Sequence, residues 1–385
     1  MPTVAEIARV LERWAPPAQK LDYDNVGLQV GDPAAPVTRV LVALDLTPAV
    51  LDEAEAMGAE LVVTHHPLLF RPLKRLTPDD PTGALALRLA RTGTAYYAIH
   101  TNLDAALAGV SVALAERLGL TGVRFLAPLE GALRKLVVFV PRTHAEAVRH
   151  ALAAAGAGCI GNYEACSFET PGTGRFRPGA GTTPAIGTPD GPEEAVDEIR
   201  LEVEVARWDV PAALAAVRAA HPYEEVAYDL YPVEQTATRA GFGAVGDLPE
   251  PEPLERFLAR VARTLPSDAL RYAGDPAMSV RRVAVCGGAG ADLIGRARAA
   301  GADAYVTADL TYHRFFEALA PDGTPRMALI DAGHYETERH TEGLLVDHLA
   351  AHFSGLDVRR TTLRTSPVRT FVGEGRRTMD DGPQG

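Results

Sequence analysis

The chain has 385 residues, of which 47% are hydrophobic and 23% are charged, the proportions of an ordinary globular protein with room for several domains. Its formal net charge of -12 argues against a dominant role in binding nucleic acid or an anionic membrane, since either would need a strongly basic surface. The cysteines cannot all pair and form no C-x-x-C motif, which favours a reducing compartment: Cys159, Cys166 and Cys286.

The N-terminal residues carry Glu6 and Glu12 and contain no apolar run typical of a signal peptide. No stretch approaches the ~20 apolar residues that a transmembrane helix needs. We therefore expect a cytoplasmic protein that does not bind membranes.

The first third of the chain alternates apolar runs with helical patterns. Strands are predicted at Val40–Leu44, Leu61–Thr64 and Tyr96–Ile99, and helices at Pro48–Met57, Thr82–Arg91 and Leu107–Leu118. Apolar strands that alternate with helices indicate a parallel sheet covered on both faces. This region therefore predicts an α/β fold.

The middle of the chain has a different order of elements. Strands are predicted at Lys135–Pro141, Ile199–Ala206 and Val226–Val233, and helices at Thr143–Gly156 and Val210–Pro222. This order is typical of a small ferredoxin-like α+β module inserted into the chain. The segment Glu169–Pro192 is rich in Gly, Pro and Thr, so we predict a long mobile loop there.

The last third repeats the plan of the first. Strands are predicted at Val283–Cys286, Ala304–Thr307 and Met327–Ile330, and helices at Asp292–Ala300, Leu310–Ala320 and Tyr335–His352. With an offset of 243 positions, Arg39–His66 aligns without a gap on Arg282–Asp309. Chance matches in an alanine-rich chain could supply part of this similarity. The matching order of elements favours an internal duplication, with two similar halves around one shared cleft.

Two adjacent histidines, His65 and His66, directly follow the strand Leu61–Thr64. Neighbouring side chains of an extended segment point to opposite faces, so the pair could serve two metal ions. A His-His pair can also be a plain polar loop feature. Its position at the carboxyl end of a parallel strand, where α/β sheets bind ligands, favours the ligand interpretation.

A second polar segment, His100 to Asp104, also follows a strand directly. The carboxylate of Asp104 could bridge two ions, while His100 could bind a metal or orient one of its ligands. The alternative is a helix cap supplied by Asn102 or Asp104.

A third segment, Gly333 to Glu338, combines a histidine with two glutamates at the start of a predicted helix. His334 and Glu338 are four residues apart and share a helix face, whereas Glu336 lies about 200° away and should point elsewhere. Acidic residues could merely complement the helix dipole, which leaves the histidine unexplained.

Three other features of the sequence bear on the cleft. Asp309 and His313 follow another predicted strand and are candidates for the cleft, although Asp309 could equally cap a helix. The glycine turn at 287–290 lacks the full G-x-G-x-x-G spacing, so we interpret it as close backbone packing rather than as a dinucleotide site. Nitrogen and oxygen ligands without cysteine suit Zn, Fe, Mn or Co and do not choose among them.

Four motifs together resemble the NIF-three-like dinuclear metal-centre family, whose members are often labelled GTP cyclohydrolase I type 2 homologues. They are DNVGLQVG (Asp24–Gly31), VVTHHPLLF (Val62–Phe70), HTNLDAA (His100–Ala106) and GHYETE (Gly333–Glu338). The resemblance covers nearly the whole chain, including GTGRFRPG (Gly172–Gly179) in the middle module. This sequence departs from the family at Tyr23, where Trp is usual, and at the segment Thr307–His313, which varies a TGD-type motif.

The resemblance implies a site that holds two divalent metal ions, with two carboxylates bridging them. Its implied ligands are His65, His66, Asp104, His334 and Glu338. It also implies a toroidal homohexamer and a middle module similar to PII/CutA-like trimerising domains. The expected division is a first α/β half at 1–130, the inserted module at 131–235, a second half at 236–372 and a flexible tail at 373–385.

Two functions remain open at this point. The first is a metal-dependent hydrolase of the GTP cyclohydrolase type that acts on a nucleotide or a related phosphorylated substrate. In that reaction His100 or His313 would act as the acid or base. Arg175 and Arg177 could approach phosphates, although exposed arginines are usually just solvated. The second is a non-catalytic, metal-binding hexameric scaffold or regulatory protein.

Overall fold

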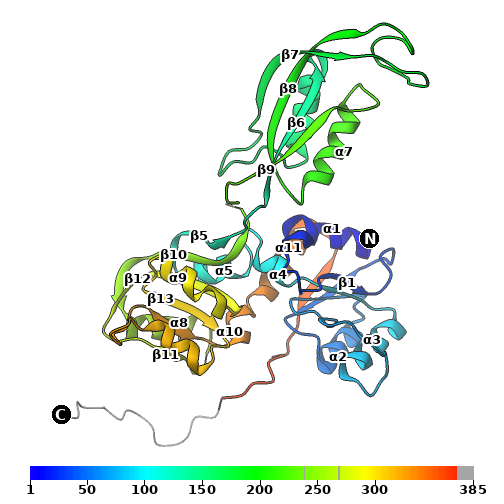
Figure 1. Ribbon diagram of the computed structural model, residues 1–385. Helices are drawn as coiled ribbons and strands as arrows, with labels where there is room; N and C mark the ends of the chain where they lie inside the picture. The colour runs from blue at the N-terminus through cyan, green and yellow to red at the C-terminus, as the bar shows by residue number, and fades with distance from the viewer. Residues whose placement is uncertain (238, 268, 371–385) are drawn as a thin grey trace, which may run out of the picture. The chain divides into compact units, whose positions relative to one another are not determined.

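The computed structural model describes residues 1–237, 239–267 and 269–370, so the predicted flexible tail at 373–385 lies outside the described residues. It shows a mixed α/β fold with three sheets (Figure 1). The described chain forms two units. The first unit contains Met1–Asp104, Ala108–Leu126 and the chain from Gly243, and the second contains Ala105–Leu107 and Ala127–Phe242.

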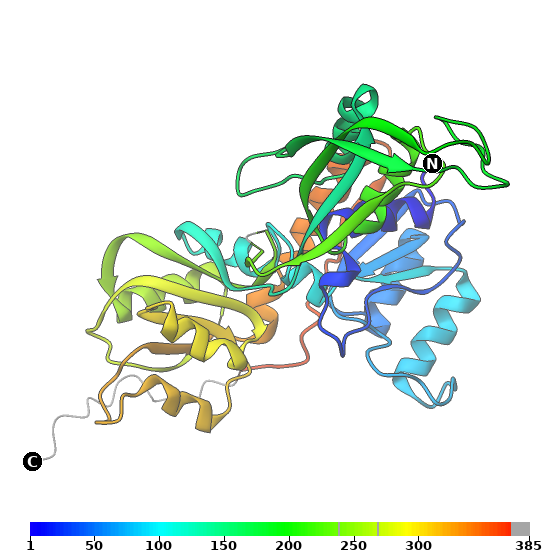
Figure 2. The ribbon, with the colours of Figure 1, turned by 45° about the horizontal axis from the view of Figure 1, so that its top comes forward.

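The first unit begins with a five-stranded sheet in which four parallel strands lie side by side. In sheet order its strands are β1 (Gly27–Val30), β4 (Ala95–Ala98), β3 (Leu61–Thr64), β2 (Arg39–Ala43) and β15 (Asp357–Arg360). Strand β1 pairs antiparallel with β4, while β4, β3, β2 and β15 are parallel. The C-terminal strand β15 therefore lies beside the N-terminal strand β2, as both views show (Figure 1 and Figure 2).

Short apolar runs form the central strands of this sheet. Every residue of β3 and β4 is buried. Helices α2 and α3 begin with caps, since Thr47 Oγ1 accepts from Val50 N and Asp80 accepts from Gly83 N. The helices and single 3₁₀ turn in this part are α1 (Val4–Trp14), η1 (Pro17–Gln19), α2 (Pro48–Met57), α3 (Pro81–Thr92), α4 (Thr101–Asp104) and α11 (Thr341–His352).

The second sheet of the first unit repeats this core of parallel strands. In sheet order its strands are β11 (Arg271–Ala273), β14 (Ala328–Asp331), β13 (Ala304–Ala308), β12 (Ser279–Ala289), β10 (Gly241–Pro253) and β5 (Thr121–Pro128). Strands β12, β13 and β14 are parallel, and β11 pairs antiparallel with β14. Its helices are α5 (Val110–Arg117), α8 (Leu254–Thr264), η3 (Ala291–Leu293), α9 (Ile294–Ala299), η4 (Tyr312–Ala318) and α10 (His334–Glu338).

The second unit is a four-stranded antiparallel sheet with two helices. In sheet order its strands are β7 (Phe168–Phe176), β8 (Glu194–Ala206), β6 (Leu133–Pro141) and β9 (Tyr228–Val233). The chain passes through them as β-α-β-β-α-β with the helices α6 (Ala145–Ala154), preceded by the 3₁₀ turn η2 (Arg142–His144), and α7 (Val210–Ala220). One apolar cluster joins both helices to β6 and β8.

Three predictions about elements were wrong. The mobile loop expected at Glu169–Pro192 contains most of strand β7, which pairs along β8 through backbone hydrogen bonds, and β8 itself begins at Glu194. The single helix expected at Tyr335–His352 is divided into α10 and α11 at Arg339 and His340. The helix expected at Leu310–Ala320 is a 3₁₀ helix, η4. No helix within the described residues is long and apolar enough to span a membrane.

Candidate metal centre

The candidate side chains all belong to the first unit and lie in the segments that follow the carboxyl ends of strands. His65 and His66 follow β3, and Asp104 ends the short helix α4 that comes after β4. His334 and Glu338 lie on α10, three residues beyond the end of β14. Because the carboxyl ends of parallel strands meet at one edge of a sheet, segments far apart in the chain can meet there.

The structure brings all five predicted ligands, together with His100, into three overlapping groups. Within each group the ligand atoms lie within 4.8 Å of one another, close enough to hold a metal ion. The groups are His65, His66 and His100; His66, His334 and Glu338; and His65, Asp104 and Glu338.

Glu338 joins two of these groups through its two carboxylate oxygens. Its Oε2 accepts hydrogen bonds at 2.9 Å from His66 Nε2 and at 3.0 Å from His334 Nε2. Its Oε1 lies 3.9 Å from His65 Nε2, which in turn lies 3.7 Å from Asp104 Oδ1. One carboxylate therefore faces two separate sets of nitrogen and oxygen ligands.

Two atoms at the centre of the site have no hydrogen-bond partner among the described residues. His65 is fully buried, and its Nδ1–H donates to the Ile99 carbonyl at 2.8 Å, which leaves Nε2 as a bare acceptor. This Nε2 and Asp104 Oδ1 are both buried and unpartnered. Two acceptors that face each other in this way are costly unless a cation lies between them. The orphaned atoms and the donor set therefore fit a divalent metal ion.

Three carboxylates outside the groups orient the imidazoles. Asp45 accepts from His66 Nδ1 at 2.6 Å, Asp24 from His100 Nδ1 at 2.9 Å, and Asp309 from His334 Nδ1 at 2.7 Å. Each of these contacts turns the other ring nitrogen of its histidine towards the centre, as in known metal sites. The sequence prediction placed Asp309 in the cleft and gave no role to Asp45 or Asp24. Asp45 lies two residues after the end of β2, so a signal like the one that identified the histidines was present there as well.

The charge of Glu338 controls the protonation of its neighbours. Although burial opposes the charged imidazole, its hydrogen bonds to the carboxylates of Asp45 and Glu338 raise the pKa of His66 to about 10. Burial likewise opposes the charge of His334, but Glu338 and then Asp309 raise its pKa to about 9. Burial raises the pKa of Asp104 well above its usual value, and the negative charge of Glu338 adds to that rise. Without a metal ion, protons therefore supply the positive charge that the site attracts.

The glycine segment at the end of β12 packs directly against Glu338. Gly288 has a φ of 63°, in the left-handed region, and an added Cβ would overlap the Glu338 carboxylate. Its backbone N–H donates to Thr337 Oγ1 at 3.0 Å, in the helix that carries Glu338. The turn thus lies where we expected close backbone packing at the cleft.

Other candidates lie outside the groups. His313 is exposed on η4, where its ring contacts Tyr312. Asn102 accepts from His100 N at 3.0 Å, which is a local backbone contact. Glu336 points to Arg364, whose Nη2 donates to it at 2.7 Å, so it turns away from the ligand face of α10 as expected.

The two arginines of the middle module have partners of their own in the second unit. Arg175 forms an exposed ion pair with Glu193 at 3.3 Å. Arg177 Nε donates to the Gly191 carbonyl at 3.0 Å. Their predicted approach to phosphates stays a prediction.

Known proteins resemble this chain over most of its length. Residues 2–367 match the profile of the family Duf34/NIF3 (NGG1p interacting factor 3). A Mycobacterium tuberculosis protein named GTP cyclohydrolase 1 type 2 homolog is 44% identical over 369 residues, which cover 94% of this chain and 96% of that protein. A Bacillus subtilis protein of the same name is 41% identical over 340 residues, which cover 88% of this chain and 90% of that protein.

A solved structure has a similar fold. The crystal structure of a Bacillus cereus protein related to NIF3 has a TM-score of 0.83 to this chain at 38% sequence identity. The superposition covers 96% of this chain and 99% of that chain.

Proposed function

Because the chain belongs to the Duf34/NIF3 family, we propose that it is a metal-dependent hydrolase with a dinuclear centre that acts on a nucleotide or related phosphorylated substrate. The observation that carries this proposal is the position of Glu338, whose two oxygens face two different sets of ligands. The relatives' name, GTP cyclohydrolase 1 type 2 homolog, makes GTP the first substrate to test.

The proposed ligand sets divide the site into two halves. His65, Asp104 and Glu338 would hold one ion, and His66, His334 and Glu338 the other. Zn, Fe, Mn and Co all accept such nitrogen and oxygen ligands. When bound, a pair of divalent ions supplies Lewis acidity that lowers the pKa of water and stabilises negative charge that develops on the substrate.

His100 is the residue that we propose for proton transfer. Its Nδ1 donates to Asp24, which leaves Nε2 as the available nitrogen. Its ring centroid lies 5.2 Å from that of His65 and 5.4 Å from that of His66. Opening a guanine ring requires a proton at the departing nitrogen, and His100 Nε2 would take that proton from the attacking water and pass it on. His313 remains the alternative proton donor from the sequence, and its exposure on η4 makes it the weaker one.

Activity of the reconstituted protein tests this proposal. The full chain, loaded with Zn, Fe, Mn or Co, is incubated with GTP and a panel of nucleotides, and products are separated by chromatography. We expect turnover that falls by at least about 100-fold in the His65→Ala/His66→Ala variant, because a metal site that loses its ligands also loses its activated water. Turnover equal to that of the variant for every nucleotide and metal would defeat the proposal.

We also propose the predicted division into two similar halves around an inserted module. The two sheets of the first unit support a duplication, since in each a run of parallel strands, β2–β3–β4 and β12–β13–β14, is followed at the same edge by an antiparallel strand. Glu60 accepts from the backbone N–H of Thr38 and Arg39. Asp303, 243 positions later, accepts from the corresponding Arg281 and Arg282.

The alternative function is a non-catalytic, cytoplasmic scaffold or regulator that assembles as a homohexamer. The β-α-β-β-α-β order of the second unit supports a PII/CutA-like trimerising module. Its edge strands expose large apolar side chains, with Phe168 on β7 66% exposed and Tyr231 on β9 48% exposed. Pull-down with metal-loaded and metal-free protein distinguishes this function, because a scaffold captures partners without turning over any nucleotide.

A further inference from the structure

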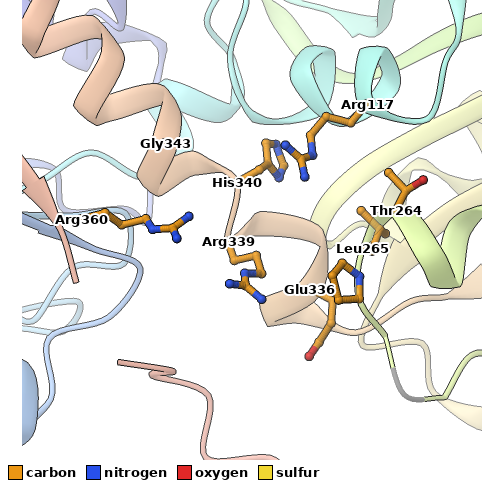
Figure 3. Close-up of a pocket in the computed structure, with 9 residues that line it drawn as sticks. Arg117, Thr264, Leu265, Glu336, Arg339, His340, Gly343 and Arg360 are labelled. Atoms are coloured by element: carbon orange, nitrogen blue, oxygen red, sulfur yellow. The ribbon is translucent and has the colours of Figure 1, made fainter. Parts of the chain in front are cut away.

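A cavity of about 230 Å³ opens beside α10 in the first unit, next to the helix that carries His334 and Glu338. Figure 3 shows its charged lining, with Arg117 from the end of α5, Arg339 from the junction of α10 and α11, and Arg360 from the end of β15. Arginines from three separate elements thus surround one space. In a chain with a net charge of -12, this gathering of positive charge needs an explanation.

Within the described chain, carboxylates pair with only one of these three arginines. Neither Arg117 nor Arg339 has an ion-pair partner among the described residues, and Arg360 Nε reaches Glu342 only at 3.9 Å. Glu336 also lines the cavity, but its carboxylate already accepts from Arg364 at 2.7 Å. The guanidinium groups therefore have unused donors, in the planar arrangement that suits phosphate oxygens.

A second and independent feature is the unpartnered nitrogen of His340, which also lines the cavity. His340 is 9% exposed, and its Nε2–H donates to the Val110 carbonyl at 2.9 Å. Its buried Nδ1 has no partner among the described residues. A buried acceptor without a donor is costly, and the hydroxyl of a protonated phosphate would satisfy it.

From the three arginines and the orphaned imidazole nitrogen we propose that this cavity binds the phosphate groups of a phosphorylated small molecule. Its volume is smaller than the ~300–1,000 Å³ of pockets that enclose a whole drug-sized ligand, so it fits phosphates rather than a complete nucleotide. The link to a substrate rests on the proposed function. The phosphates belong either to a nucleotide or to a separate polyphosphate, and the binding experiment below distinguishes the two.

Binding of inorganic triphosphate to the full chain tests the proposal by calorimetry, with metal-loaded and metal-free protein side by side. The variant Arg117→Gln/Arg360→Gln removes two guanidinium groups from the cavity. The matched control is Arg359→Gln, because Arg359 neighbours Arg360 on β15 but pairs with Asp357 at 2.7 Å. Circular dichroism verifies that both variants are folded.

We expect triphosphate to bind in both metal states. Its affinity should fall at least about tenfold in the double variant, since charge-assisted hydrogen bonds are lost. The control should stay within about twofold of the unchanged chain. Tighter binding of GTP than of triphosphate identifies the phosphates of a nucleotide, and equal binding identifies polyphosphate alone.

Triphosphate that fails to bind metal-free protein, or that binds both variants equally, would overturn the phosphate site. The proposed hydrolase would survive that result, because its metal ligands lie on the other face of α10. Triphosphate binding without any nucleotide turnover would leave the phosphate site intact and count against the hydrolase. The two proposals can therefore fail separately.

Discussion

Replacing Glu338 by glutamine is expected to remove both metal ions from the protein. Glu338 is the one residue shared by the sets that contain His334 and Asp104, so an amide at this position weakens both sites at once. The loss of a charged ligand should lower metal affinity by more than about 100-fold, above the range seen when only a supporting residue is changed. Elemental analysis after dialysis against metal-free buffer measures the effect.

Glu336→Gln is the matched control for this experiment. Glu336 lies on the same short helix, two residues before Glu338, but hydrogen-bonds to Arg364 and lies outside the three ligand groups. Its variant should keep the metal content of the unchanged chain. Equal metal content in the two variants, whether high or low, would show that Glu338 has no special role.

Metal affinity is expected to fall steeply as the pH is lowered from 8.5 to 7. Without metal, the pKa of His66 is about 10 and that of His334 about 9, so both imidazoles carry protons throughout this range. A metal ion binds only the neutral ring and must displace both protons. The logarithm of the affinity should therefore rise by about two for each unit of pH, an effect of about 100-fold.

The affinity falls at low pH because neighbouring carboxylates keep these two imidazoles protonated. Asp45 and Glu338 stabilise the charged imidazole of His66, so Asp45→Asn should lower its pKa and make the affinity less dependent on pH. Calorimetry in buffers of different ionisation enthalpy counts the protons released per ion. A metal affinity that does not change between pH 7 and 8.5 would contradict the assigned protonation.

The positions of the ligands were predictable because they depend on a simple rule of α/β sheets. The strand at Leu61–Thr64 was predicted with the bounds that the structure shows, and the histidines follow it without a gap. Asp104, His334 and Glu338 obey the same rule after their own strands. The family resemblance drawn from these motifs was confirmed by the match over residues 2–367.

The supporting carboxylates were harder to predict from the sequence. A single aspartate after a strand, such as Asp45, is as typical of a turn or a helix cap as of a metal site. Its role depends on contacts with His66 and with Thr365, whose hydroxyl donates to Asp45 Oδ2 at 2.6 Å. Thr365 is separated from Asp45 by 320 positions, a contact that no local pattern indicates.

Long-range contacts also explain the wrong predictions of secondary-structure elements. Strand β7 has no apolar pattern, and all but two of its residues are exposed, so it exists through backbone pairing with β8. The break between α10 and α11 falls at His340, which donates to Val110, a residue 230 positions away. Local periodicity detects neither kind of long-range interaction.

Anomalous diffraction from crystals of the protein, collected at the absorption edge of the metal found by elemental analysis, tests the dinuclear centre most directly. We predict two peaks about 3.5–4 Å apart, one beside His65 and Asp104 and one beside His66 and His334, with Glu338 between them. A single peak, or peaks away from Glu338, would contradict the account.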